Sequence, residues 1–168
     1  MKKNYKKTLL ACYLGFITQA ICANFAPLLF LTFRRIFGIS LEQITVLVTA
    51  NFVVQFTTDF LSAKFADKIS YRTGMMTAHA LAALGLTGLA WLPYVLPAFA
   101  GLLLATVIYA AGGGLLEVLV SPIVEACPTE QKSSSMSMLH SFYCWGSVAV
   151  ILGSTAFFWV FGVENWRI

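Results

Sequence analysis

Long apolar runs separated by short polar segments make up almost the whole chain. The runs stay apolar over more than about 18 residues, whereas the strands of a membrane barrel alternate in polarity over segments of about ten residues. The first run has roughly 26 residues and is about 39 Å long as a helix, enough to cross a hydrocarbon core of about 30 Å. The pattern predicts five membrane helices, at about residues 8–33, 41–65, 74–92, 98–126 and 136–161.

The end of the first run and the start of the second are marked by residues that interrupt or begin helices. We expect Pro27 to kink the first helix near its end, because proline lacks a backbone N–H. Arg34, Arg35 and Gly38 then predict a short loop, and Ser40 provides a residue that favours the first position of a helix.

The later helix boundaries depend on prolines and on one polar segment. Residues 73–116 carry no charge and are too long for a single crossing of the membrane. Pro93 and Pro97 divide this stretch into a tight hairpin of two helices. Residues 127–135, CPTEQKSSS, predict a polar loop before the fifth helix.

The composition is that of an integral membrane protein. Hydrophobic residues make up 59% of the chain, charged residues only 11%, and the mean hydropathy is +0.81. A soluble domain carries roughly 25% charged residues. Because lipid offers no hydrogen-bonding partners, the backbone must satisfy its own polar groups, and continuous apolar runs do this as helices. We therefore expect an all-α protein embedded in a lipid bilayer.

The cysteines and the net charge do not indicate a metal site or nucleic-acid binding. The four cysteines have no C-x-x-C or Cys/His spacing, and we interpret them as small buried hydrophobic residues: Cys12, Cys22, Cys127 and Cys144. The net charge of +4 comes largely from four lysines before the first apolar run, where positive charge sets membrane orientation. We expect no cofactor, no metal and no nucleic-acid partner.

The distribution of lysine and arginine predicts the orientation of the chain. Eight of these residues fall in the amino terminus and in the segments after the second and fourth predicted helices, and three fall on the opposite side. Cytoplasmic segments are enriched in lysine and arginine. We therefore expect a multi-pass protein of the cell membrane with a cytoplasmic amino terminus.

Polar residues recur at helical spacing within four of the predicted helices. Residues at i, i+4 and i+8 share a face of about 80°. The sets in the second and fourth helices have this spacing, the fifth helix carries a comparable stripe, and the first helix contributes two amides. The stripe residues are Gln19 and Asn24; Asn51, Gln55 and Asp59; Tyr109, Gly113, Glu117 and Ser121; and His140, Tyr143, Cys144 and Ser147. Such stripes face a water-filled cavity, or they hold helices together through hydrogen bonds, and the sequence leaves both readings open.

Glu117 stands out because it is a carboxylate between apolar runs, in Gly112 to Pro122. A charge at the bilayer centre costs about 2.5 to 3.5 kcal/mol on insertion scales. We interpret Glu117 as a functional carboxylate that exchanges a proton, with structural pairing as the alternative. Asp59 lies nearer the cytoplasmic end, where pairing with Lys64 or Arg72 is the simpler interpretation.

Between the second and third predicted helices, the chain resembles the gate motif of the major facilitator superfamily. In that family the motif reads Gly-x-Leu-Ala-Asp-Arg-x-Gly-Arg-Arg. Asp67, Lys68 and Arg72 match it by residue type, whereas Ala63 and Tyr71 are among the departures. The resemblance implies that Asp67, Lys68 and Arg72, with Asp59 nearby, hold the two halves of a transporter together at the cytoplasmic side.

The fourth and fifth predicted helices are similar to the fucose permease branch of that family. A glycine pair precedes Glu117 and Ser121-Pro122 follows it, with serine in place of the asparagine of the branch. The segment 138–146 also resembles that branch. The resemblance implies a proton-coupling role for Glu117. The branch also implies an acid on the first helix, where this chain has only amides, so facilitated or differently coupled transport stays open.

The function expected from these patterns is transport of a small polar solute, most simply a sugar, by alternating access. The family has twelve helices in two halves, each half containing six. We therefore expect an incomplete six-helix amino-terminal half, a fragment that lacks the carboxyl-terminal half of the transporter. The alternatives are a five-helix scaffold or assembly protein and a membrane enzyme. Catalysis is disfavoured because no nucleophile has a base nearby and no metal spacing is present.

Overall fold

The computed structural model describes residues 5–65, 70–128 and 131–167, apart from the side chains of 63 and 65. These residues form an all-helical bundle with no strand among them. Its helices are α1 Lys6–Leu28, α2 Phe30–Phe37, α3 Leu41–Phe65, α4 Tyr71–Val95, α5 Ala98–Ala126, α6 Lys132–Phe161 and the short 3₁₀ helix η2 Val163–Asn165. Five of them, α1, α3, α4, α5 and α6, are long and apolar enough to cross a membrane, which confirms the predicted all-α membrane fold with five spans.

The first predicted helix is interrupted rather than only kinked. Helix α1 ends at Leu28, the residue after Pro27. The chain continues through Leu29 into α2, which begins at Phe30. The predicted loop at Arg34 and Arg35 is wrong, because both residues belong to α2. The break lies where Pro27 removes one backbone donor from the last turn of α1.

Two local devices end α2 and begin α3. Gly38 adopts a left-handed conformation with φ 66° and closes α2, and its N–H donates to the Arg34 carbonyl oxygen at 3.0 Å. Ser40 and Gln43 then form a reciprocal capping box. The Gln43 N–H donates to Ser40 Oγ at 3.2 Å, and the Ser40 N–H donates to Gln43 Oε1 at 2.9 Å.

The hairpin between α4 and α5 turns later than the sequence predicts. Pro93 lies inside the last turn of α4, which continues to Val95, so the expected end at Leu92 is wrong. The turn is made by Leu96, which is extended, and by Pro97, which precedes the first residue of α5. A residue before proline favours the extended conformation, and this ends α4.

The polar segment before α6 is shorter than predicted. Helix α6 begins at Lys132 instead of about 136, so the serines 133–135 are helical. Serine is only modestly unfavourable in a helix, and the first turn needs few intrahelical partners. Helix α5, by contrast, has the predicted bounds of 98 and 126.

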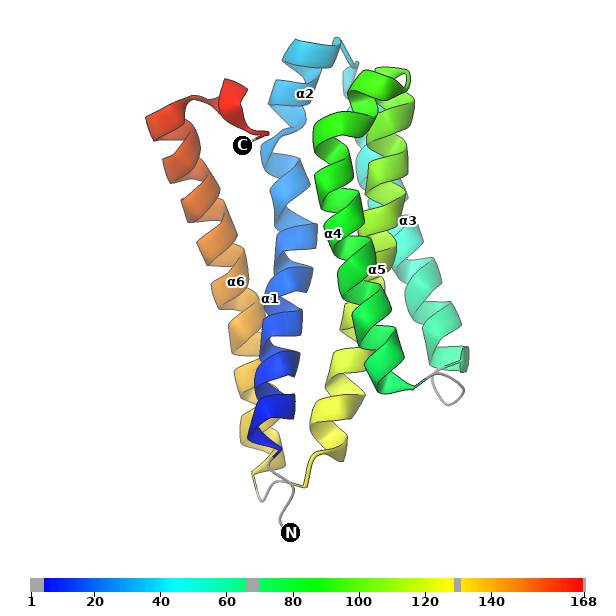
Figure 1. Cartoon of the computed structure of the whole chain (residues 1–168), viewed down its shortest axis with the longest axis vertical. Helices are drawn as coiled ribbons and strands as arrows, with labels where there is room; N and C mark the ends of the chain where they lie inside the picture. The colour runs from blue at the N-terminus through cyan, green and yellow to red at the C-terminus, as the bar shows by residue number, and fades with distance from the viewer. Residues whose placement is uncertain (1–4, 66–69, 129–130, 168) are drawn as a thin grey trace.

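Helix α5 lies at the centre of the described bundle (Figure 1) and contacts α4, α3 and α1, while α6 packs along α1. Glycines allow the close approaches. A Cβ atom at Gly112 would lie 2.5 Å from the Ala82 backbone nitrogen, and one at Gly146 would lie 3.1 Å from the Ile17 Cα atom. These contacts set how α5 and α6 are rotated, and therefore which of their side chains face one another.

The carboxyl-terminal segment folds back onto the far end of the bundle, away from the start of α1 (Figure 1). Trp166 is buried there, with its ring 5.2 Å from that of Phe33 in an edge-on arrangement. The Arg167 guanidinium lies 4.7 Å from the centre of the Tyr94 ring. An exposed ion pair of 3.1 Å joins Arg35 to Glu164. The segment after α6 is thus held against α2 and α4.

Burial differs strongly among the five long helices. In the most apolar stretch of α5, 56% of the residues are buried, against 6% in those of α3 and α6. Helices α3 and α6 therefore stand at the margins of the described bundle, one on each side of the central helices (Figure 1). Residues of α1 and α5 line a cavity together with residues of α3 and α6, and the polar stripes meet there.

Candidate functional site

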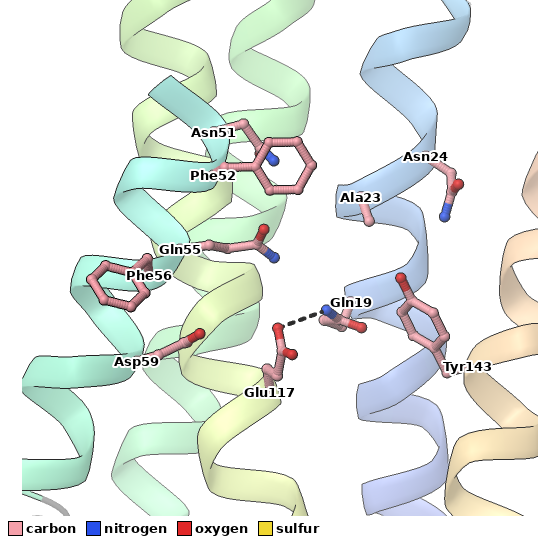
Figure 2. A pocket seen from close by; sticks show the side chains of 10 residues that line it. All are labelled: Gln19, Ala23, Asn24, Asn51, Phe52, Gln55, Phe56, Asp59, Glu117 and Tyr143. Carbon is pink, nitrogen blue, oxygen red and sulfur yellow. Dashed lines mark hydrogen bonds between the residues drawn. The ribbon is translucent and has the colours of Figure 1, made fainter. Parts of the chain in front are cut away.

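A cavity of about 500 Å³ lies between four helices of the bundle, with α3 on one side and α1 and α6 on the other (Figure 2). Its lining residues come from α1, α3, α5 and α6: Gln19, Ala23, Asn24, Asn51, Phe52, Gln55, Phe56, Asp59, Glu117 and Tyr143. The structure thus brings together seven of the sequence-predicted site residues, namely Gln19, Asn24, Asn51, Gln55, Asp59, Glu117 and Tyr143.

A second cavity of about 330 Å³ continues from the first toward the amino-terminal end of α6. It shares Gln19, Glu117 and Tyr143 with the first cavity and adds Phe16, Ser121 and His140. The predicted residue His140 therefore lies by this second cavity, next to the Phe16 ring at 5.7 Å. Because three residues belong to both cavities, the polar surface is continuous from Asn51 to His140.

Glu117 lies at the junction of the two cavities and extends from the middle of α5 toward α1 (Figure 2). Its Oε2 atom accepts a hydrogen bond of 3.2 Å from Nε2 of Gln19, a buried residue of α1. Within the described residues, no ion pair neutralises Glu117. The carboxylate is therefore held by an amide donor and is open to the cavity, instead of being paired with a cation.

Asn24 combines the two readings that the sequence leaves open. Its Nδ2 atom donates to the Ala20 carbonyl oxygen at 2.8 Å and to Ser147 Oγ of α6 at 3.1 Å, so it joins α1 to α6. It also lines the larger cavity. The residue thus holds two helices together and also contributes to the cavity wall.

Tyr109 lies apart from the other predicted residues. It is only 3% exposed and belongs to the apolar core between α4 and α5, where the position of Gly85 lets the two backbones meet. The residue is eight positions before Glu117, which turns its side chain about 80° around α5. That rotation is enough to direct Tyr109 toward α4, and it does not line either cavity.

Asp59 lines the larger cavity. No ion pair joins it to Lys64 or Arg72, so the expected pairing is wrong. Lys64 is five residues later on the same helix, which places it about 140° away around the axis. Asp59 instead faces α5, and its Oδ1 atom lies 3.1 Å from the position that a Cβ atom at Gly114 would occupy.

Of the other predicted gate residues, the structure describes only Arg72, and no ion pair joins it to Asp59. Asp67 and Lys68 fall outside the described residues. Arg72 is in the first turn of α4 and lines a separate cleft beside Lys7 and Met75. The gate role therefore stays a prediction for Asp67, Lys68 and Arg72.

Sequence reasoning missed two aromatic residues of the site. Phe52 and Phe56 line the larger cavity and are 64% and 72% exposed. Each directly follows a residue of the polar stripe on α3, Asn51 and Gln55. Their spacing of four residues is a signal for a shared face, but in a membrane helix an aromatic residue is equally expected to face lipid.

The arrangement can bind an uncharged polar molecule. The carboxamides of Gln19, Asn24, Asn51 and Gln55 each carry both donors and acceptors, and Glu117 and Asp59 add acceptors. The volume of the larger cavity falls within the range of about 300 to 1,000 Å³ that is typical of small-molecule sites. No group of three or more histidine, cysteine, aspartate or glutamate side chains that would suit a metal ion occurs among the residues described.

Comparison with known families agrees with this architecture. The family model of the Major Facilitator Superfamily matches residues 11–168 of the chain. No curated protein and no solved structure matches it. A match over so much of the chain, to a bundle of five long apolar helices of which four line a polar cavity, leads to one conclusion: the chain belongs to the Major Facilitator Superfamily, whose members carry small solutes across membranes.

Proposed function

We propose that the protein carries a small polar solute, a sugar, across the cell membrane by alternating access, with the cavity beside Glu117 as the solute site. The observation that supports this most directly is the convergence of polar side chains from four helices on one open space. Polar groups in membrane helices are costly, so their collection around a single cavity favours a transport pathway over scattered structural roles.

The chemistry of the lining favours a sugar over a lipid or an ion. Carboxamides can donate to and accept from the hydroxyl groups of one sugar ring at the same time, as Asn51 and Gln55 can on adjacent turns of α3. Phe52, Phe56 and Tyr143 add aromatic faces that pack against the C–H groups of such a ring. This combination of amides and aromatic rings is what a molecule with polar edges and apolar faces needs.

Proton coupling is part of the proposal, with Glu117 as a carboxylate of the proton pathway. The resemblance to the fucose permease branch supports this role, and so does the position of Glu117 where the two cavities meet. A carboxylate that contacts both solute and water can link proton movement to solute movement, since its charge changes the interactions around the site.

We also propose that the chain is the amino-terminal part of a longer transporter, with its amino terminus in the cytoplasm. Phe52 and Phe56 are more than half exposed, so one side of the cavity lacks a wall within the described part of the chain. A second half that covers this side would enclose the solute, as alternating access requires. Sequencing the gene beyond the Ile168 codon tests this directly: about seven further helices are expected, whereas an immediate stop codon would favour the scaffold alternative.

Uptake by cells that express the whole gene tests the transport function. We expect one or more radiolabelled sugars from a panel of hexoses and pentoses to accumulate above the level of cells with an empty vector. Accumulation should increase with an inward proton gradient, and Glu117→Gln should abolish this dependence. Glu125→Gln is the matched control, because Glu125 lies two turns further along α5 and outside the two cavities that contain Glu117. Unchanged pH dependence in Glu117→Gln would remove Glu117 from the mechanism.

A further inference from the structure

We propose that Asp59 is a second carboxylate of the proton pathway, and that it holds an exchangeable proton. The inference rests on the proposed transport function and adds a residue to its proton pathway. It also provides a second acid from α3, whereas the wall that α1 contributes to the cavity contains only amides and an alanine as its lining residues.

The first observation is the position of the Asp59 oxygen that faces α5. Oδ1 is buried and has no hydrogen-bond partner among the described residues. It lies 3.1 Å, and the Gln55 carbonyl oxygen 3.2 Å, from the point where a Cβ atom at Gly114 would stand. The oxygens of Asp59 and Gln55, both acceptors, thus lie beside Gly114, and no described group donates a hydrogen bond to the Asp59 oxygen. A buried carboxylate oxygen without a donor is costly, and a proton on that oxygen lowers the cost because it removes the charge.

The second observation is the contrast with Glu117. The oxygen Oε2 of Glu117 already accepts a hydrogen bond from the amide of Gln19, and the side chain opens to the cavity. Hydrogen bonds donated to a carboxylate favour its charged form. Of the two acids in this cavity, one is therefore supplied with a donor and the other is not. The proton belongs on the side chain that lacks the donor.

The third observation is that no positive charge lies among the residues that line the cavity. The titratable groups near Asp59 are Glu117 on α5 and Tyr143 on α6, with His140 beyond them by the second cavity. From α1 come the amides of Gln19 and Asn24, and the buried thiol of Cys22 beside Gly113. Two ionised carboxylates in one cavity without a cation repel each other, so a single shared proton is the favourable occupancy.

The transfer is a simple proton exchange with no other bond change. A proton from water binds Asp59 Oδ1 and neutralises that carboxylate, and later leaves to water or to Glu117, which then becomes the neutral partner. Gly114 leaves room for this arrangement, because a Cβ atom there would make a tight contact with Oδ1.

Carbodiimide labelling measures the proposed proton without any transport assay. Dicyclohexylcarbodiimide is apolar and adds to protonated carboxyl groups. The product is an acylurea that contains all atoms of the reagent and of the side chain, so the reaction has no leaving group. The protein produced from the whole gene is purified, labelled at neutral and at alkaline pH, and mapped by peptide mass spectrometry. We expect the label on Asp59 at neutral pH, its loss at alkaline pH, and little label on Glu117.

Matched variants and a second measurement keep the experiment decisive. Asp59→Asn should lose the label and Glu125→Gln should keep it. The infrared C=O band of a protonated carboxyl group should be present in the unmodified protein and absent in Asp59→Asn, whether or not the reagent reaches the site. Absence of both the label and the band overturns the proposal. Protection of Asp59 when sodium chloride replaces choline chloride also overturns it, because sodium would then be the bound cation.

These outcomes are separable from those of the transport function. Sugar uptake by a protein whose Asp59 carries no proton leaves the transport function in place and removes this inference. A labelled Asp59 in a protein that accumulates none of the sugars contradicts the proposed substrate and leaves the proton on Asp59 established.

Discussion

Gln19 and Glu117 are 98 positions apart in the chain, yet a hydrogen bond of 3.2 Å joins Gln19 Nε2 on α1 to Glu117 Oε2 on α5. Gln19 is 5% exposed, so packing holds its amide in place, while the carboxylate extends into the space beside it. A buried residue of one helix thus orients the charged residue of another at the point where two cavities meet.

This relationship predicts a strong coupling between the two side chains. Gln19→Met keeps the length and removes the donor, and a hydrogen bond to a charged group contributes about 1.5 to 3 kcal/mol. We expect sugar uptake to fall by roughly tenfold or more, in line with about 1.4 kcal/mol per tenfold change. Uptake measured for the parent protein, Gln19→Met, Glu117→Gln and the double variant gives a double-mutant cycle. Equal losses in the double variant and in Glu117→Gln alone are expected, and independent, additive losses would contradict the coupling.

The close contact between α4 and α5 predicts a sharp difference between two glycines. A Cβ atom at Gly112 would lie 2.5 Å from the Ala82 nitrogen, which belongs to the backbone and cannot rotate away. Gly112→Ala should therefore lower the free energy of unfolding by about 1 to 3 kcal/mol. Thermal unfolding in detergent measures this change.

Gly153→Ala is the matched control for that prediction. Gly153 lies within α6 and a Cβ atom there would have nothing within 4 Å. Alanine favours a helix over glycine by about 0.8 to 1.0 kcal/mol, so this variant should be as stable as the parent or more stable. Equal destabilisation by both substitutions would show that the α4–α5 contact is looser than described.

Trp166 should stabilise the carboxyl-terminal segment. The residue is 6% exposed and its ring meets Phe33 at 5.2 Å. Trp166→Ala removes this packing and should cost about 3 kcal/mol. Trp159→Ala provides the comparison, since Trp159 is 87% exposed and should change stability far less. The same thermal unfolding experiment separates the two, and similar losses for both tryptophans would contradict the docking of this segment.

The capping box at Ser40 predicts a local effect. Ser40→Ala removes the oxygen that accepts the Gln43 N–H and should cost about 1 kcal/mol. Ser40→Asp keeps an acceptor at the same position and should retain most of the stability. Hydrogen exchange of the amides in the first turn of α3 measures the change, with faster exchange expected in Ser40→Ala alone. Faster exchange in both variants would indicate that the acceptor is not what protects this turn.

The aromatic residues of α3 test the sugar proposal. Phe56 lines the cavity and Phe60, one turn further along, does not, although both are exposed. Aromatic contacts contribute about 0.5 to 1.5 kcal/mol beyond area burial. Phe56→Leu should therefore raise the KM for uptake by roughly two- to tenfold, whereas Phe60→Leu should leave it unchanged. An equal change in both variants would indicate a general effect on α3 and not a contact with the solute.

The sequence by itself determined that the chain is a five-span helical membrane protein, and where most of its helices lie. The length of an apolar run specifies a membrane helix because the backbone must bond within itself in lipid, and this depends on neighbouring residues only. Helix α5 has the predicted bounds for that reason. The stripe of Asn51, Gln55 and Asp59 also follows from the sequence, since residues four apart share a face of any helix.

Only the tertiary structure decided which face of each helix meets the cavity. Tyr109 and Glu117 belong to one stripe, yet the first is buried against α4 and the second opens to the cavity. Asp59 faces Gly114 and not a basic residue. The rotation of a helix about its axis is set by close contacts such as that of Gly112 with Ala82, between residues far apart in the chain. Periodicity along one helix carries no information about those contacts, because they depend on the surfaces of the helices packed against it.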